Sequence, residues 1–249
     1  MVVLKTNREL MAMKDAGKIS AQALQLAGET VKAGMSTYEL DHIIHNFIKS
    51  QNAIPSFLGY GGYPASSCIS INDEVIHGIP SKTHLIKEGD IVSVDVGAYY
   101  NGYHGDNAAT FAVGKISDEA RQLLEVTKEC LKRGIAAAVA GARIGDISYA
   151  VQSYAEGFGY GVVRKFVGHG IGKEMHESPE VPNYGNPGHG LRLMPGMTIA
   201  IEPMINIKGH DVKVMSDGWL VKTTSGSLSA HFEHTIAITD NGPVIMTMP

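Results

Sequence analysis

Apolar and polar residues recur with two different periods along this chain, and the two periods predict helices and strands. Apolar residues at helical spacing predict four helices, over residues 8–28, 36–51, 117–139 and 145–156. Runs rich in β-branched residues predict five strands, over residues 91–99, 103–113, 162–167, 197–206 and 232–239. Helices alternate with strands, but the Asn101–Gly102 pair between two of the strands is typical of a tight hairpin. Part of the sheet is therefore expected to be antiparallel.

The pattern occurs twice, at a constant spacing of 107 residues. The matching positions are Ala33–Gly34 with Ala140–Gly141, Glu39–Leu40 with Asp146–Ile147, Gly89 with Gly196, and Asp95 with Glu202. Each copy then returns on a second strand that carries another acid, Asp106 in the first and Glu233 in the second. Two copies of about 100 residues are too few and too long for a solenoid. We therefore interpret the chain as a single domain, 1–249, made of two similar halves, about 1–115 and 116–249.

Two acids of the first half lie on the predicted hairpin. A two-residue loop at 101–102 places Gly97 opposite Asp106. Asp95 is then a diagonal neighbour of Asp106 on the same face, roughly 7–8 Å away between backbones. The valines that alternate with Asp95 point to the other face.

Two like charges on half-buried strands repel each other, and each is costly to remove from water. These strands carry no Lys or Arg. One acid could be protonated, a distant base could reach in, or a cation could bind. The acids could also simply be solvated near the mouth of the hairpin. The second half favours a cation, because Glu202 and Glu233 again lie in apolar strands and a duplication would bring four carboxylates together.

Three histidines add candidate chemistry. His169 lies among glycines that allow close approach of the backbone, and it is either an ordinary polar residue or a nitrogen ligand beside the carboxylates. A mixed nitrogen and oxygen site suits divalent Mn, Fe, Co or Zn better than Mg or Ca. Five donors fit a pair of ions roughly 3.5–4 Å apart, which activates water for hydrolysis. His77 and His176 are either surface loop residues or proton carriers and donors to an oxyanion.

Composition narrows the classes of function. The 249 residues carry a net charge of −4, with 21 basic and 25 acidic residues and no long run of one sign. This argues against a specific nucleic-acid surface and against a polybasic membrane anchor. The N-terminal residues lack the apolar centre of a signal peptide, and the weakly polar run 134–142 is too short to span a bilayer. Two cysteines without a CxxC motif suit a reducing compartment, so we expect a cytoplasmic enzyme.

Over nearly its whole length the chain resembles the type I methionine aminopeptidases. The matching stretches are INDEVIHGIP, DIVSVDVGAYYNGYHGD, FVGHGIGKEMHESPEVPNYG, GMTIAIEPM and FEHTIAIT. The resemblance implies the pita-bread fold, a pseudo-twofold-symmetric α/β (α+β) domain with a mainly antiparallel central sheet covered by helices. It implies a cytoplasmic, monomeric hydrolase that removes the initiator methionine from nascent polypeptides, prefers a small second residue and meets the ribosome transiently.

The resemblance also implies a role for each candidate residue. Two divalent ions (Co, Mn, Fe or Zn) would be held by Asp95, Asp106, His169, Glu202 and Glu233, with Asp106 and Glu233 shared between the ions. The catalytic residues would be His77, His176 and Glu202. The substrate would be bound by Tyr60, Tyr63, Cys68, His77, His176 and Trp219, and a monovalent cation would lie near Asn72 and Ser229.

The chain departs from the family pattern at two pocket positions. Phe57 stands where several bacterial members have a cysteine, and Met175 stands where phenylalanine is common. Both residues are apolar, so we expect altered affinity rather than altered specificity. The 31 residues from Glu202 to Glu233 leave no room for the helical subdomain that type II enzymes insert there.

Three other functions remain open at this point. An Xaa-Pro aminopeptidase or dipeptidase would carry a large additional N-terminal domain. A creatinase-like enzyme would use no metal, and a catalytically inactive pita-bread binding protein would have lost ligands. The complete set of five candidate ligands argues against the last two.

Overall fold

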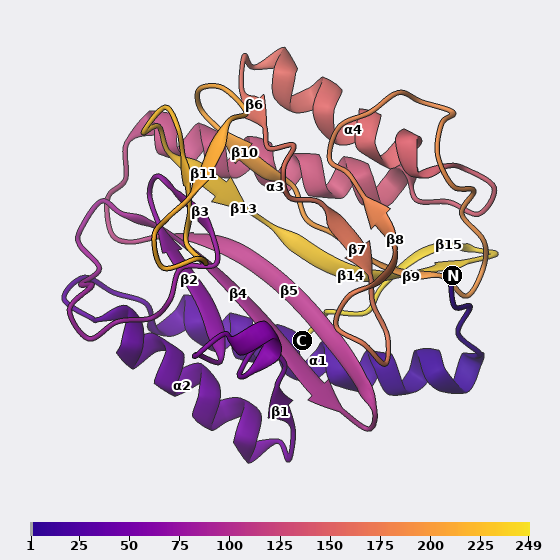
Figure 1. Ribbon diagram of the computed structural model, residues 1–249, viewed down its shortest axis with the longest axis horizontal. Helices are drawn as coiled ribbons and strands as arrows, with labels where there is room; N and C mark the ends of the chain where they lie inside the picture. The colour runs from indigo at the N-terminus through magenta and orange to yellow at the C-terminus, as the bar shows by residue number, and fades with distance from the viewer. Residues whose placement is uncertain (1) are drawn as a thin grey trace.

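A curled, nine-stranded sheet forms the centre of the computed structural model, which describes residues 2–249 (Figure 1). The helices are α1 (Asn7–Thr30), α2 (Thr37–Ser50), α3 (Asp118–Ala137) and α4 (Ile144–Gly157), with a short 3₁₀ turn at Tyr60–Gly62. The strands before α3 are β1 (Ile54–Pro55), β2 (Ser67–Ile71), β3 (Glu74–Ile76), β4 (Ile91–Tyr100) and β5 (Tyr103–Ala112). The strands after α4 are β6 (Gly161–Val162), β7 (Gly168–Gly170), β8 (Glu177–Val181), β9 (Thr198–Ile201), β10 (Met204–Asn206), β11 (Val212–Val214), β12 (Val221–Thr223), β13 (Ser229–His231), β14 (Glu233–Thr239) and β15 (Gly242–Ile245).

The central sheet has the strand order β1-β4-β5-β14-β9-β7-β8, with β2 also paired to β4 and β15 to β14. Each of these pairings is antiparallel. Two small three-stranded sheets, β13-β10-β6 and β11-β12-β3, lie beside it. The predicted α/β architecture with a mainly antiparallel sheet is therefore confirmed.

The four predicted helices are confirmed to within about two residues at each end. Capping residues in the sequence mark where two of them begin. At the start of α2, Ser36 and Glu39 form a capping box, in which each side chain bonds the backbone N–H of the other residue. Ser117 caps α3 by accepting a hydrogen bond from the backbone of Ala120. None of the helices within residues 2–249 is long and apolar enough to cross a membrane.

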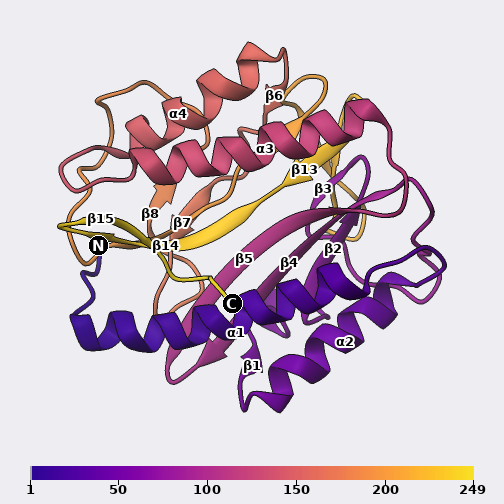
Figure 2. The ribbon, with the colours of Figure 1, turned by 180° about the vertical axis from the view of Figure 1, so that it is seen from behind.

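The helices cover one face of the sheet, and the candidate acids lie on the other face. Val92, Val94 and Val96 of β4 are fully buried in a core that they share with α1 and α2. Seen from behind, α1 and α3 lie across the sheet (Figure 2). Gly105 of β5 lets α1 approach closely, because a Cβ at this position would lie 2.5 Å from the Cα of Gly17.

Several local features recur at the predicted spacing of 107 residues. Both ends of α4 are displaced by 107 from the ends of α2. The paired glycines share a left-handed backbone, with φ of 88° and 90° at Gly34 and Gly141 and of 89° and 90° at Gly89 and Gly196. The division into halves, about 1–115 and 116–249, stays a prediction with which these features are consistent.

Two predicted strands are wrong in their extent. In place of the predicted strand 162–167, the structure has only the two-residue strand β6, Gly161–Val162. The chain then leaves the sheet, and Phe166 and Val167 line the cavity described below. Residues 197–206 divide into β9 and β10, which belong to different sheets. The break falls at Glu202–Pro203, where the proline has no N–H to donate to a ladder.

Candidate metal centre and substrate cavity

The strand register places three candidate acids in one row across the sheet. Asp95 on β4 pairs with Ala108 on β5, and Ala108 pairs with Glu233 on β14. Glu202 directly follows β9, whose last residue pairs with the neighbour of Glu233. Side chains at paired positions leave the sheet on the same side. The row therefore gathers Asp95, Glu233 and Glu202 on the face that the helices do not cover.

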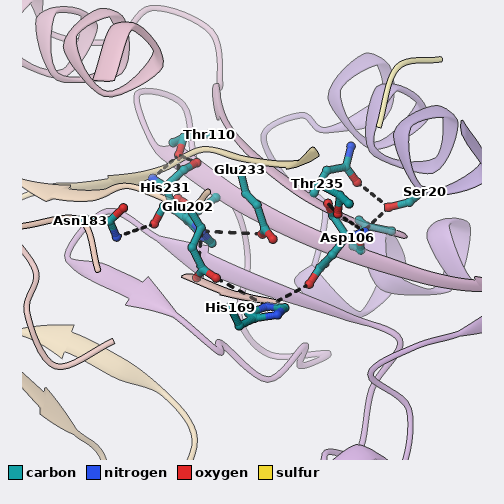
Figure 3. A network of polar contacts seen from close by, with 12 residues as sticks. Ser20, Asp106, Thr110, His169, Asn183, Glu202, His231, Glu233 and Thr235 are labelled. Carbon is teal, nitrogen blue, oxygen red and sulfur yellow. Dashed lines mark hydrogen bonds and ion pairs between the residues drawn. The ribbon is translucent and has the colours of Figure 1, made fainter. Parts of the chain in front are cut away.

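A second row, two residues further along the strands, adds the other two candidates. Asp106 lies opposite Gly97, so the predicted hairpin register is confirmed. The backbone N–H of Asp106 donates to Thr235 Oγ1 (3.1 Å), and that hydroxyl donates to the Asp106 carbonyl (2.8 Å). His169 lies on the short strand β7 beside β9. Its Nε2 is 3.8 Å from Asp106 Oδ2 and 3.6 Å from Glu202 Oε1 (Figure 3).

The site is buried and strongly charged. The ligand atoms of Asp106, His169 and Glu233 lie within 4.8 Å of one another, and these residues are 3%, 8% and 2% exposed. Burial and repulsion from neighbouring acids raise the pKa of Asp106, Glu202 and Glu233 well above the usual range. Burial also raises the pKa of Asp95 to about 7 and lowers the pKa of His169 to about 3.

These residues fit a divalent metal centre. Within the described residues, Asp95 Oδ1, Asp106 Oδ1 and Glu233 Oε1 are buried without a hydrogen-bond partner. An orphaned carboxylate oxygen is costly in a protein interior. A cation would supply the missing partner and reverse the local electrostatics, because it favours the ionised acids and neutral imidazole. One nitrogen and four carboxylates suit Mn, Fe, Co or Zn.

A cavity of about 180 Å³ joins these side chains to the predicted substrate residues. Its apolar wall consists of Phe57, Tyr63, Cys68 and Met175, which are buried, and Trp219, which is partly buried. Cys68 on β2 pairs with Asp95 on β4, so the wall begins directly beside the acids. This volume lies below the roughly 300–1,000 Å³ of typical ligand pockets, so the cavity suits one side chain rather than a long peptide.

The two predicted catalytic histidines also line this cavity. The ring of His176 lies 4.1 Å from that of His169, and its Nδ1 is 2.8 Å from the Tyr60 hydroxyl. His77 has a left-handed backbone (φ 61°), which is strained for a residue with a side chain, and its ring meets Trp219 edge-on. Burial lowers the pKa of His176, and burial together with His176 lowers the pKa of His77 to about 4. Both rings are therefore neutral near pH 7 and can donate one hydrogen bond each.

Asn72 and Ser229 are brought together outside the cavity. The backbone N–H of Ser229 donates to the carbonyl of Asn72 (2.9 Å). The Asn72 side chain is already engaged, since Oδ1 accepts from Ile91 N (3.1 Å) and Nδ2 donates to Asp90 Oδ1 (2.8 Å). A monovalent cation at this position stays a prediction.

The sequence pattern missed two features of the site. Lys5 and Glu177 form a buried ion pair, with side chains 3% and 12% exposed, that ties the N-terminal segment to the residue after His176. They are 172 residues apart, so no local pattern could reveal the pair. His231 points at two of the acids, and its position two residues before Glu233 was the available signal.

Comparison with known proteins agrees with this geometry. Residues 11–240 match the model of metallopeptidase family M24. A methionine aminopeptidase of Clostridium acetobutylicum is 56% identical over 100% of this chain and 99% of its own length. Methionine aminopeptidase 1 of Bacillus subtilis is 51% identical over 99% of both. The crystal structure of the methionine aminopeptidase from Thermotoga maritima superposes with a TM-score of 0.98 at 45% identity, over 100% of each chain.

Proposed function

This chain belongs to metallopeptidase family M24, and from that premise we propose how its own residues carry out the reaction of a methionine aminopeptidase. The chain is a methionine aminopeptidase, because it matches relatives of that name over nearly their full length. The reaction is the hydrolysis of the first peptide bond of a chain that begins with methionine. The observation that carries the assignment of residues is the convergence of five candidate ligands and an apolar pocket in one cavity.

We propose that Asp95, Asp106, His169, Glu202 and Glu233 hold two divalent ions drawn from Mn, Fe, Co or Zn. The buried oxygens of this set that have no hydrogen-bond partner among the described residues support the assignment. When bound, the ions polarise the scissile carbonyl and activate water near neutral pH. The protein holds the acids close together and buries the cluster away from bulk water.

The apolar wall is proposed to bind the methionine side chain. Cys68, Met175 and Trp219 offer polarisable or aromatic surface, which suits a flexible thioether. Tyr63 is held rigidly because its hydroxyl donates to the carbonyls of Ser67 (3.1 Å) and Gly78 (2.9 Å). Since one side chain fills a cavity of this size, we propose a preference for a small second residue.

Glu202 is proposed to transfer protons, and His77 and His176 are proposed to donate hydrogen bonds to the substrate. Glu202 has one carboxylate oxygen toward His169 and the other toward His231, and it is proposed to take a proton from the attacking water and pass it to the leaving amine. Nδ1 of His176 faces Tyr60, so Nε2 is free to donate to the oxyanion of the tetrahedral intermediate. His77 lies at the rim beside Trp219, where it is proposed to donate to the substrate backbone near the second residue.

We also propose the cellular setting that this substrate implies. Free N-terminal methionine is a property of new polypeptides, so we propose a cytoplasmic monomer that meets nascent chains transiently at the ribosome. Binding of nucleic acid or membrane is not part of the proposal, because the chain carries a net charge of −4 with no basic run.

A peptide assay tests the proposed function. Metal-stripped protein is titrated with Fe(II), Mn(II), Co(II) or Zn(II), and the cleavage of Met-Ala-Ser is compared with that of Ala-Pro-Ser. We expect metal-dependent release of methionine, and loss of turnover in Asp106→Ala and Glu233→Ala with the fold retained. Preferential cleavage of Ala-Pro-Ser would indicate an Xaa-Pro peptidase instead. Full activity of either alanine variant would exclude the proposed metal centre.

A further inference from the structure

His231 is a buried histidine that faces the proposed metal centre without belonging to its five candidate ligands. Its side chain is 2% exposed, and within residues 2–249 its Nε2 has no hydrogen-bond partner. This nitrogen lies 4.0 Å from Glu202 Oε2 and 4.0 Å from Glu233 Oε2 (Figure 3). A buried ring nitrogen at equal distances from two carboxylates is well placed to influence the direction of both.

The backbone of His231 is held in place by contacts on both sides. Its backbone N–H donates to Thr110 Oγ1 (2.9 Å), and its carbonyl accepts from the same hydroxyl (2.9 Å). Thr110 on β5 is itself 2.8 Å from Ser93 Oγ on β4. On its other side His231 pairs with Met204 of β10. The residue is therefore fastened between two sheets at the point where β13 ends and Glu233 begins β14.

The geometry separates His231 from the ligands themselves. Nε2 of His169 lies 3.6 Å from Glu202 and 3.8 Å from Asp106, whereas the two acid oxygens that face His231 lie 4.0 Å from its Nε2. Its Nε2 instead approaches one oxygen of Glu202 while His169 approaches the other, Oε1. An N–H between two carboxylates restricts both, and groups that orient metal ligands in this way strengthen metal binding.

We propose that His231 is a positioning residue, whose Nε2–H faces the Glu202 and Glu233 carboxylates at 4.0 Å and directs them, by attraction between the N–H and the acids, toward the geometry that metal binding requires. The inference rests on the metal centre proposed above. His231 does not touch the substrate or the reacting atoms in this role. Its effect should therefore appear in metal affinity before any turnover is measured.

Calorimetric titration of metal-stripped protein with Mn(II) tests this role without an activity assay. His231→Leu removes the donor and should weaken the Kd about 10- to 100-fold. His231→Gln keeps an N–H at similar reach and should restore the Kd to within about threefold. His234→Leu is the matched control, because His234 bonds Thr247 and lines a gap on the helix-covered face. It should leave the Kd unchanged.

The outcomes distinguish the inference from the proposed function. An unchanged Kd in His231→Leu would overturn the positioning role, whereas failure of the wild type to bind Mn(II) would overturn the metal centre itself. Equal losses in the leucine and glutamine variants would show that imidazole is needed as a ligand, which also contradicts the proposal. If the leucine variant does not fold, the visible spectrum of the Co(II)-loaded glutamine variant decides. Unshifted bands support an unchanged ligand set, and shifted bands refute it.

Discussion

Replacing Asp106 with asparagine should stabilise the metal-free protein while it weakens metal binding. Asp106 is 3% exposed, and its ligand atom lies within 4.8 Å of that of Glu233. Without a cation, the two acids either repel each other or take up protons, and both are unfavourable. An amide has nearly the same shape and carries no charge, so the substitution removes this cost. It also removes a strong oxygen ligand.

The size of the effect follows from the distance. Two unit charges 4.8 Å apart repel by about 3.5 kcal/mol at an effective dielectric constant of about 20. Uptake of a proton relieves part of this repulsion, so we expect a gain of about 1–3 kcal/mol in the free energy of unfolding. For a chain of this size that is a rise in Tm of roughly 2–12 °C. Metal at 100 times its Kd should add about 2.7 kcal/mol to the wild type, and much less to the variant.

Differential scanning calorimetry measures both effects. Each protein is stripped with EDTA, scanned, and scanned again with excess Mn(II). Asp41→Asn is the matched control, because Asp41 Oδ1 accepts from Ser66 N, Ser67 N and Ser67 Oγ outside the cluster. It should not raise the metal-free Tm and should keep the full metal-induced rise. A metal-free Asp106→Asn protein that melts below the metal-free wild type would refute the electrostatic argument.

Three further changes test separate parts of the structure. Gly105→Ala forces a Cβ against the backbone of α1 and should lower the free energy of unfolding by about 1–3 kcal/mol in urea, whereas Gly157→Ala meets no atom within 4 Å and should not. Tyr60→Phe removes the hydrogen bond to His176 Nδ1. It should lower kcat about fivefold with little change in KM, and a change confined to KM would contradict this role. Because burial lowers the pKa of His77 from 6.5 to about 4, the folded protein binds fewer protons than the unfolded chain between these values. His77 should therefore contribute a loss of up to about 3 kcal/mol as pH falls through this range, and the urea midpoint of His77→Asn should fall less steeply with pH than that of the wild type.

The hairpin that carries Asp95 and Asp106 could be predicted from sequence because few alternatives exist for it. A two-residue loop fixes which residues face each other, and the period of two then fixes which side chains share a face. Glu202 was added through the 107-residue repeat, and Glu233 through the acid on the returning strand of each half, at a longer spacing of 127 residues. The predicted convergence therefore depended on symmetry as well as on periodicity.

The parts that could not be predicted depend on contacts between distant segments. His169 was a candidate ligand, but its strand, Gly168–Gly170, is too short to show a period and was not predicted. Strand β6 ends at Val162, and the residues that follow it line the cavity, which is built from segments distant in sequence. Pro203 indicates a break in the predicted strand 197–206, but the apolar residues on both sides of Glu202–Pro203 favoured one continuous strand. The sequence alone could not show that the two pieces join different sheets.

The position of the metal centre follows from how β5 and β14 are joined. Their ladder has two paired positions, Glu233 with Ala108 and His234 with Asn107. Thr235 and Thr110 extend it through side-chain hydrogen bonds to Asp106 and His231. The contact between β5 and β14 is thus short, and the buried acids Asp106 and Glu233 repel each other across it. A cation held by Asp106 and Glu233 would replace that repulsion with attraction at the same place. Metal binding should therefore stabilise the contact between β5 and β14 more than the separate cores packed against α1 and α3, and hydrogen exchange at Asn107 and Ala108 should slow most when Mn(II) is added.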